Sequence, residues 1–451
     1  MHISTARLSR RTLLRGALAG VGFAPLALLA PAAQAVRAGH AARPLAAAEF
    51  DAGVVTSWCH ELGALIKSTP GYSPPVASRA IGYVGVALYE ALLPGMPGHR
   101  SLGDILSGLG DIPRTGRNAA YAWPVVASAA IAELARAFFP GAPAERRLSI
   151  ERLEAGFAAT APRGIRERST DRGHAVARAV FAWSTSDGGH EGYLRNVQPS
   201  YAPPAGPGLW EPTPPGHLPA LQPSWGGNRM FVSHPDTCDP GPPPPYSVDQ
   251  TSACFLEAHD VWHTVNQLDS EQRLIAQFWA DDPGATSTPP GHSLSIYAQV
   301  AEQRTVSLDV AAEGLARLGM AVSDAFVACW RTKYRHNLLR PITYIRATIE
   351  PGWGDPLPVT TPPFPEYTSG HSVQSAAAAE VLTAQFGRTA FIDRTHEPRG
   401  FAARAFPSFE AAAAEAAISR LYGGIHFRSA IDRGLEQGRC IGAGVATLDL
   451  R

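Results

Sequence analysis

The spacing of apolar residues constrains the fold of this chain more than any other feature. Across residues 47–184, and again from about Thr251 to the C-terminus, apolar residues recur three and four positions apart, as in ASRAIGYVGVALYEALL (residues 77–93). Such spacing places them on one face of an α-helix. The alternation typical of strands is scarce. The sequence therefore predicts an all-α fold, built as two packed helical bundles.

A stretch rich in Pro, Gly and Trp separates the two helical halves. Residues 187–248 include QPSYAPPAGPGLWEPTPPGHLPALQPSWGG, which is too rich in aromatic residues to be a flexible linker. We expect an ordered wrap across the surface, at the edge of a cleft. The expected organisation is an export signal (residues 1–35), an N-terminal helical bundle (36–186), the wrap (187–248) and a C-terminal helical bundle (249–451).

The N-terminus has the pattern of a secretory signal. Arg10 and Arg11 precede a mildly apolar stretch, residues 16–30, and the small-residue cleavage pattern of Ala33 to Ala35. The run SRRTLL (residues 9–14) resembles the twin-arginine signal of proteins exported in the folded state. The apolar stretch is short and interrupted by proline, which argues against a membrane anchor. A periplasmic or extracellular location without a membrane span is predicted.

Charge and cysteine content narrow the function classes. The chain has 39 basic and 39 acidic residues, and removal of residues 1–35 takes away four arginines, which leaves 35 basic and 39 acidic residues. This balance argues against a nucleic-acid binder. The five cysteines show no Cys-x-x-Cys pairing. A disulfide between Cys238 and Cys254 is left open, and the other three cysteines are expected to be buried thiols.

Three segments of the second half carry groups suited to an anion. In WRTKYRHNLLRP, Lys333 precedes Arg340 by seven residues, which would place both cations on one helix face ahead of the break at Pro341. In PFPEYTSGHS, a proline-rich loop turns into an alanine-rich helix at Ser369, Gly370 and His371; the start of a helix offers unpaired N–H groups to an anion. In SRLYGGIHF, two glycines let the chain turn and direct Arg420 and His426 inward.

In this order, the three segments resemble the signature of the vanadium haloperoxidases and type 2 phosphatidic acid phosphatases, a superfamily with a shared tetraoxoanion pocket. The resemblance is specific over residues 330–432. It implies a fold like that of vanadium chloroperoxidase. It also implies an oxyanion site that binds vanadate in the haloperoxidases and forms a phosphohistidine intermediate in the phosphatases. The residues that match this site are Lys333, Arg340, Ser369, Gly370, His371, Arg420 and His426.

Carried over to these positions, the resemblance gives each residue a role. The three cations would hold the equatorial oxygens, with Ser369 and the Gly370 N–H as further donors. His426 would be the axial metal ligand, or the nucleophile of a phosphatase, and His371 the acid/base. In fungal chloroperoxidase, a segment similar to QFWADDPGATSTPPGH supplies a buried carboxylate that orients one arginine. The matching residue in this chain is Asp282.

Two positions depart from the signature. Thr368 replaces the usual proline, and it could itself cap the helix. Ala430 stands where many members carry an aspartate four residues after the second histidine. Ring orientation at His426 would then come from a backbone carbonyl or from Asp432, whose role is left open.

Aromatic residues beside the signature distinguish the two chemistries. Trp330 and Phe364 match aromatic positions of the halide pocket of fungal chloroperoxidase, and an apolar wall suits a large, poorly hydrated halide. We therefore expect a vanadate-dependent haloperoxidase that oxidises bromide with hydrogen peroxide and halogenates small organic substrates, with chloride left open. The alternatives are a secreted acid phosphatase, which needs no cofactor, and a non-catalytic oxyanion-binding protein. The oligomeric state is open, with a homodimer as one candidate.

A rival metal site is present on a single segment. His259 and His263 lie four residues apart, as in helical zinc sites, but the segment lacks the glutamate base and an evident third ligand. We interpret them as ordinary histidines. His336 is likewise expected to be a supporting or exposed residue.

Overall fold

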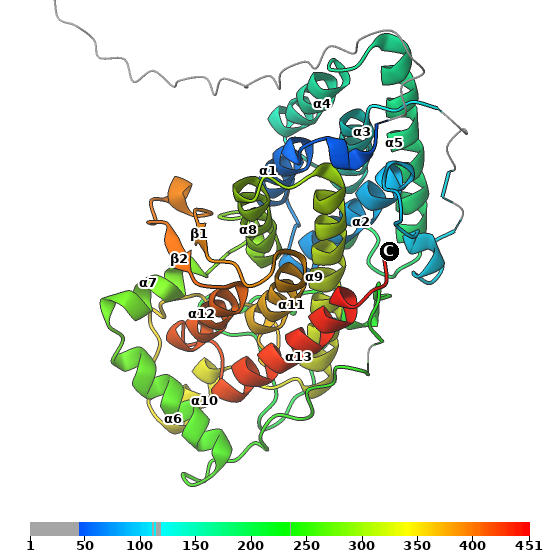
Figure 1. The fold of residues 1–451 in the computed structure, drawn as a ribbon. Coiled ribbons are helices and arrows are strands. Elements are labelled where there is room, and N and C mark those ends of the chain that lie inside the picture. Colours follow the sequence, from blue (N-terminus) through cyan, green and yellow to red (C-terminus); the bar gives the residue numbers. More distant parts are fainter. Residues whose placement is uncertain (1–44, 111, 114–118, 235) are drawn as a thin grey trace, which may run out of the picture. The chain divides into compact units, whose positions relative to one another are not determined.

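The computed structural model describes residues 45–110, 112–113, 119–234 and 236–451, and within them the regular secondary structure is almost entirely helical (Figure 1). The predicted all-α class is confirmed. The α-helices of the described residues are α1 (Gly53–Ser68), α2 (Pro74–Leu92), α3 (Trp123–Phe138), α4 (Ala144–Ala158), α5 (Arg163–Ser184), α6 (Ala253–Asn266), α7 (Ser270–Phe278), α8 (Thr288–Gln303), α9 (Leu308–His336), α10 (Pro341–Thr348), α11 (Gly370–Phe386), α12 (Phe409–Tyr422) and α13 (Arg428–Ala446). A hairpin of β1 (Phe391–Asp393) and β2 (Arg404–Phe406) pairs Phe391 with Phe406.

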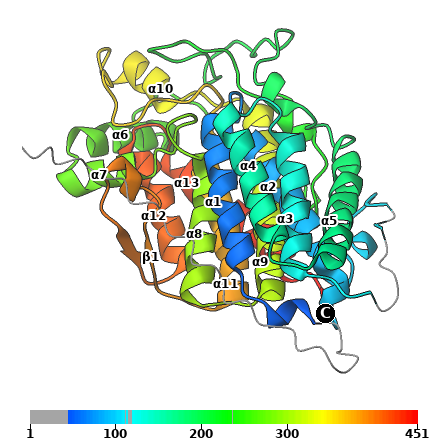
Figure 2. The same cartoon turned by 90° about the horizontal axis from the view of Figure 1, so that it is seen from above.

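Helix α9 is the central element of the fold. It packs along α2 on one side and along α11 and α13 on the other. Figure 2 shows α3 and α5 on one side of the molecule and α6, α7 and α12 on the opposite side. Residues 43–451 form one compact unit, so the predicted bundles are joined through α9 into one body.

Glycines allow α2 and α9 to approach closely. A Cβ on Gly85 would lie 2.6 Å from the Leu315 carbonyl oxygen, and one on Gly319 would lie 2.7 Å from the Ile81 carbonyl oxygen. Side chains larger than glycine would separate the two backbones. Helix α2 is long and apolar enough to cross a membrane, but 94% of its most apolar window is buried inside the protein. Its apolar composition therefore reflects its place in the core.

The Pro/Gly/Trp-rich stretch is an ordered wrap. It has no α-helix among its described residues, and it is held by bonds to its neighbours. The carboxylate of Asp324 on α9 accepts the backbone N–H groups of Phe231 (2.6 Å), Val232 (2.9 Å) and Ser233 (3.0 Å). The Leu221 N–H donates to the Pro363 carbonyl (2.8 Å). Pro363 begins the proline-rich segment before α11, residues 363–369, which we call the anion loop. The wrap therefore braces α9 and that loop together.

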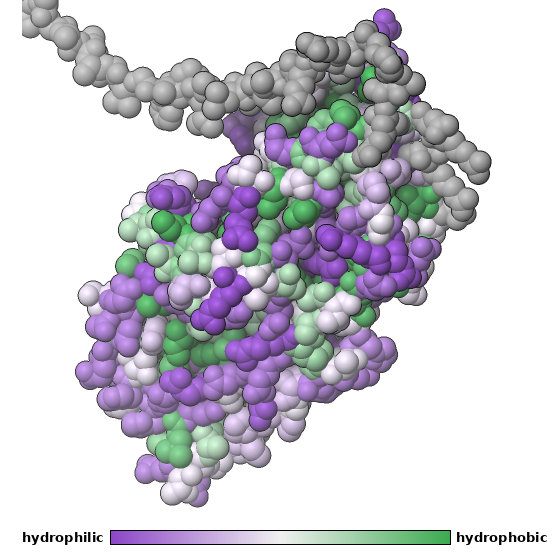
Figure 3. Space-filling view, viewed as in Figure 1, coloured by the Kyte–Doolittle hydropathy of each residue, from purple (hydrophilic) through white to green (hydrophobic). Residues whose placement is uncertain are grey.

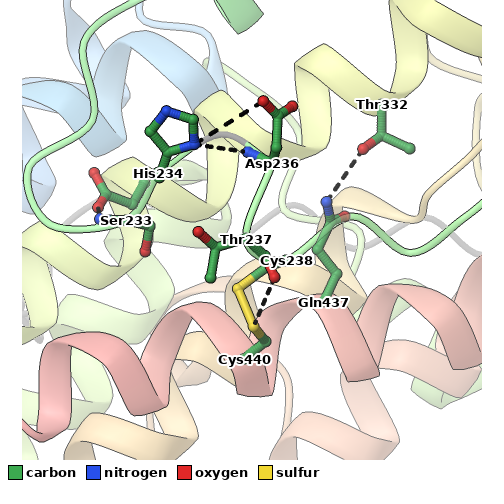
Figure 4. Close-up of a disulfide and its surroundings, with 9 residues drawn as sticks. Ser233, His234, Asp236, Thr237, Cys238, Thr332, Gln437 and Cys440 are labelled. Carbon is green, nitrogen blue, oxygen red and sulfur yellow. Dashed lines mark hydrogen bonds and ion pairs between the residues drawn. A yellow bond between two sulfur atoms is a disulfide. The ribbon is translucent and has the colours of Figure 1, made fainter.

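A disulfide ties the wrap to the last helix. Cys238 bonds to Cys440 on α13, 202 residues away (Figure 4). The pairing of Cys238 with Cys254 is therefore wrong, and Cys440 is not a free thiol. Cys254 is a buried free thiol on α6, as are Cys59 on α1 and Cys329 on α9. Spacing along the chain favoured the nearer partner, whereas the path of the wrap brings Cys238 to α13.

The predicted signal, residues 1–35, lies outside the described residues. The face in Figure 3 is mainly hydrophilic, with smaller hydrophobic patches between polar residues. The cations and histidines of the predicted anion site are not part of such an exposed surface, because nearly all of them are buried.

Candidate active site

The anion loop joins α11 as the sequence predicts, with one difference. The Ser369 hydroxyl accepts the Ser372 N–H (3.4 Å), so Ser369 is the N-cap and Gly370 begins the helix. Thr368 does not cap the helix, because its hydroxyl instead donates to Gln437 (2.7 Å). The first N–H groups of α11 and the positive end of its helix dipole therefore both point toward the anion loop.

Lys333 and Arg340 do not share a helix, contrary to the prediction. Helix α9 ends at His336 because Asn337 adopts a left-handed conformation (φ 45°). Arg340 is extended (φ −82°, ψ 154°) and caps α10, as a residue before a proline prefers. Both side chains are nonetheless fully buried, so the turn between them brings the two cations together by another route.

Lys333 holds the anion loop in place through three hydrogen bonds. Its Nζ donates to the backbone carbonyls of Pro365 (3.0 Å), Glu366 (2.9 Å) and Thr368 (2.5 Å). Burial lowers the pKa of Lys333 to about 7. Because its three N–H donors are engaged with carbonyls, Lys333 acts on the site mainly through its charge and through the loop that it holds.

The two arginines are fixed by backbone carbonyls. Arg340 donates to Phe364 (2.8 Å) and Ile425 (2.8 Å), and its Nη2 is buried with no hydrogen-bond partner. Arg420 donates to the Ser419 hydroxyl (2.9 Å) and to the Ala276 carbonyl (3.0 Å). Burial lowers the pKa of each guanidinium to about 10, so both remain charged at neutral pH. Arg420 near the end of α12 and Arg340 just before α10 therefore supply two fixed positive charges.

His426 is oriented by Glu366, a residue that the sequence analysis missed. The His426 Nδ1 lies 2.7 Å from Glu366 Oε1, which also accepts the Phe427 N–H (2.9 Å). Because Oε1 is already an acceptor, His426 donates through Nδ1, and its Nε2 lone pair accepts a hydrogen bond from Arg340 Nη1 (3.3 Å). Burial, and then the cations Arg340, Lys333 and Arg420, hold the pKa of His426 well below its usual value. A neutral imidazole that carries a lone pair on Nε2 is the form that can bind a metal.

Glu366 is fully buried beside His426. Burial raises the pKa of its carboxyl to about 8, while Lys333 and Arg340 oppose that rise. It takes the role that was left open between a backbone carbonyl and Asp432. Asp432 is exposed and does not orient the ring, and the Ala430 carbonyl accepts the Ser369 N–H instead (3.0 Å).

His371 faces the same site from the start of α11. Its Nε2 is buried and has no hydrogen-bond partner. Burial, and then the charge of Arg420, hold the pKa of His371 well below its usual value, while a bond to the Trp279 backbone opposes this. His371 is also one of the groups that lower the pKa of His426, so the two histidines are close enough to interact.

Together these residues form what we call the anion cage: Lys333, Arg340, Ser369, Gly370, His371, Arg420 and His426. Three buried cations interact with two buried carboxylates, Glu366 and Asp281, which leaves an excess of positive charge that a multiply charged anion would balance. The unpartnered Arg340 Nη2 and His371 Nε2 would both gain an acceptor from such an anion. The residues present therefore fit a tetraoxoanion such as vanadate or phosphate.

The two predicted pocket aromatics flank the cage. The rings of Trp330 and Phe364 lie 4.8 Å apart, and the Trp330 Nε1 donates to Leu221 of the wrap (3.2 Å). The Lys333 Nζ lies 5.0 Å from the Phe364 ring centre, and the Arg340 guanidinium lies 4.9 Å from it. Phe364 thus covers both cations with an aromatic face that keeps water from them.

Three further predictions have different outcomes. Asp282 is exposed, and the buried carboxylate of its segment is the neighbouring Asp281. The charges of both aspartates oppose the lowering of the Arg420 pKa by burial, and Asp281 has the larger effect. His336 is half-buried and packs its ring edge-on against Tyr367 (5.6 Å), away from the cage cations. His259 and His263 are exposed on α6 with their rings 6.4 Å apart.

The fold and the cage together define a helical enzyme with a buried oxyanion site, and comparison with known proteins specifies it further. Residues 314–449 match the family model described as the VCPO second helical-bundle domain. A bacterial vanadium-dependent iodoperoxidase is 34% identical, with a TM-score of 0.81, covering 89% of this chain and 97% of that one. A bacterial vanadium-dependent chloroperoxidase in its holo form is 17% identical, with a TM-score of 0.64, covering 84% and 92% of the two chains. No curated protein shows a significant match.

This chain belongs to the vanadium-dependent haloperoxidase family. It is an oxidoreductase that acts on peroxide. The family membership favours this activity over the phosphatase and non-catalytic alternatives.

Proposed function

We propose that this enzyme uses vanadate, held in the anion cage, to oxidise iodide and bromide with hydrogen peroxide. The observation that carries the proposal is the convergence of three buried cations and two neutral histidines on one site. Bound vanadate supplies a Lewis-acidic centre that activates peroxide. The oxidised halide would then halogenate small organic molecules.

The residues of the cage would divide the work among them. His426 would be the protein ligand of the metal, because Glu366 holds its Nδ1 and leaves Nε2 directed at the cage. Arg340 and Arg420 would bind the oxyanion oxygens, with the Ser369 hydroxyl and the Gly370 N–H as further donors. His371 would carry protons to and from peroxide, since its unpartnered Nε2 can accept or donate one.

Two features support iodide and bromide over chloride. Trp330 and Phe364 offer an aromatic wall beside the cations, which suits a large and weakly hydrated anion. Lys333 has its three donors engaged with backbone carbonyls, so fewer N–H groups remain to polarise bound oxygens. Chloride is the hardest of the three halides to oxidise and needs the strongest activation. The similar iodoperoxidase agrees with this order.

The test is a halide panel at saturating vanadate and peroxide. Oxidation of iodide, bromide and chloride would be compared in wild type and in Phe364→Leu, with Phe401→Leu, which lies on the hairpin side of the fold, as the control. We expect the order iodide, bromide, chloride, and a raised halide KM in Phe364→Leu alone. Equal rates with chloride and iodide would contradict the proposed specificity.

We also propose that the protein is exported through its twin-arginine signal. The disulfide between Cys238 and Cys440 supports this, because such bonds persist in oxidising compartments. Replacing Arg10 and Arg11 by lysine should keep the enzyme inside the cell. Export of that variant at the wild-type level would contradict the proposal.

A further inference from the structure

A second cluster of polar side chains is buried between α7, α8 and the β1–β2 hairpin. It consists of Asp281, His292, Asp393 and His396, and we call it the Asp281 cluster. None of the four is more than 2% exposed. Two carboxylates buried together need compensating positive charge. Asp281 acts on Arg420 of the anion cage through its charge, and the activity proposed above gives the other three residues no task.

The contacts within the cluster are close but incompletely satisfied. His292 Nδ1 lies 2.8 Å from Asp281 Oδ2, and His292 Nε2 lies 2.7 Å from Asp393 Oδ2. His396 Nε2 approaches Asp281 Oδ1 to 3.1 Å. That approach lacks the alignment of a hydrogen bond, so both atoms are buried with no hydrogen-bond partner. Two unpartnered atoms thus face each other inside the core.

Two kinds of positive charge could balance this cluster. A proton shared by His292 would satisfy Asp281 Oδ2 and Asp393, but it would leave His396 Nε2 and Asp281 Oδ1 without partners. A cation between Asp281, His292 and His396 would engage those two atoms as well. Two carboxylates and two neutral imidazoles carry a charge of −2, which Arg420 offsets only through its electrostatic interaction with Asp281 and which a divalent ion would balance directly. The second account therefore leaves fewer buried groups unsatisfied.

The donor set also has the usual form of a metal site. One ligand atom from each of Asp281, His292 and His396 lies within 4.8 Å of the others, and no other such group of three occurs in the described part of the chain. Asp393 binds the far nitrogen of His292, which is the common arrangement for a histidine that ligates a metal. Two imidazoles with one carboxylate suit zinc and other divalent first-row ions.

We propose that Asp281, His292 and His396 bind one divalent transition-metal ion, with zinc as the first candidate, and that Asp393 orients His292. The ion would be structural. Trp279 stacks on His292 (4.5 Å), and Phe278 packs edge-on against His396 (4.9 Å), so the site is closed by aromatic rings. It would fasten α8 to the segment that follows β1, two parts of the chain about a hundred residues apart in sequence.

The test measures bound metal and thermal stability in the full mature chain. Purified protein would be stripped with a chelator, dialysed and titrated with zinc chloride, with metal content read by mass spectrometry and Tm by calorimetry. We expect about one zinc ion per chain and a rise in Tm, because an ion that binds only the folded state stabilises it. Cobalt(II) in place of zinc should give visible absorption bands of a nitrogen- and oxygen-bound ion.

Two variants localise the effect. His396→Ala should lose the bound zinc and the rise in Tm. The double variant His259→Ala/His263→Ala, which removes the exposed histidine pair of α6, should keep both. If His396→Ala does not fold, His396→Gln and the chelation of wild type provide the same comparison. Wild type that binds no zinc, cobalt, iron or manganese, or a His396 variant that retains its zinc, would overturn the proposal and leave a protonated His292 as the balancing charge.

Discussion

The anion cage and the Asp281 cluster are two buried histidine sites that the same fold builds for opposite purposes. In both, a carboxylate lies within 2.8 Å of a ring nitrogen: Glu366 at His426, and Asp281 at His292. In the cage, burial lowers the pKa of His426, and the charges of Arg340, Lys333 and Arg420 lower it further. In the cluster, the other nitrogen faces a second carboxylate, and Asp281 and Asp393 raise the pKa of His292 to about 10 against the effect of burial.

Burial lowers the pKa of both histidines, so the difference between them comes from the charges around each one. Surrounded by cations, His426 is held neutral beside groups that attract an anion. Surrounded by carboxylates, His292 attracts a proton or a metal cation. Arg420 is near both sites, because Asp281 acts on its pKa while Arg420 acts on those of His371 and His426. It is thus close enough to interact electrostatically with both sites.

The largest effect is expected from His426→Ala, which removes the one protein ligand of the proposed vanadate. Halide oxidation should fall to background even with excess vanadate, because the cations alone can hold the anion but cannot bind the metal. Steady-state iodide oxidation measures this. Normal turnover in the variant would assign the ligand to another residue and break the contrast with His292.

His371→Ala should be the next largest. Turnover should fall by about 10²–10⁴-fold, the usual contribution of a positioned proton donor, while vanadate binding changes little. Equilibrium dialysis followed by rate measurement at saturation separates the two quantities. A His371 variant that binds no vanadate would reverse the roles of the two histidines.

Arg340→Ala should weaken vanadate binding by about 2–5 kcal/mol, since it removes a buried charge whose Nη2 is free to meet the anion. Arg340→Lys is the matched control, because it keeps the charge and loses the planar fork. We expect it to lie between wild type and Arg340→Ala in dialysis. Wild-type affinity in both variants would mean that the anion binds elsewhere.

Glu366→Gln should lower vanadate affinity or turnover by about 10–100-fold, the usual effect of losing the partner that orients a metal-binding histidine. Glutamine keeps the size of the side chain and can still accept the Phe427 N–H. Vanadate dialysis and turnover at saturation, with Asp432→Asn as the exposed-carboxylate control, test this role. An equal loss in both variants would show that Glu366 does not orient His426.

The smallest effect is expected from His396→Ala on the anion cage. Vanadate affinity should change by no more than about threefold, because the cluster acts on the cage through the charges of Asp281 and His292 and not through His396. Its effect should appear in the Tm instead. A large loss of vanadate affinity would show that the two sites work as one.

Regular apolar spacing predicted the fold class, and the resemblance of three short motifs to a known signature named the seven residues of the cage. Sequence alone failed where partners come from distant segments. Glu366 sits within the motif region, yet its partner His426 lies sixty residues away and no spacing rule connects them. Asp393 and His396 meet His292 only through the hairpin, and Cys440 meets Cys238 only through the path of the wrap. The helix break at Asn337 depended on one left-handed residue in an otherwise helical run.

The central claim, that one buried cage binds a tetraoxoanion and uses it to oxidise halide, is tested most directly by titrating vanadate-free enzyme with orthovanadate while iodide oxidation is followed. We predict that activity rises from background and saturates at one vanadate per chain, and that inorganic phosphate shifts the curve to higher vanadate in competition for the same cations. Halide oxidation that is independent of vanadate, or phosphomonoester hydrolysis without vanadate and with no halide oxidation at any vanadate concentration, would contradict the account.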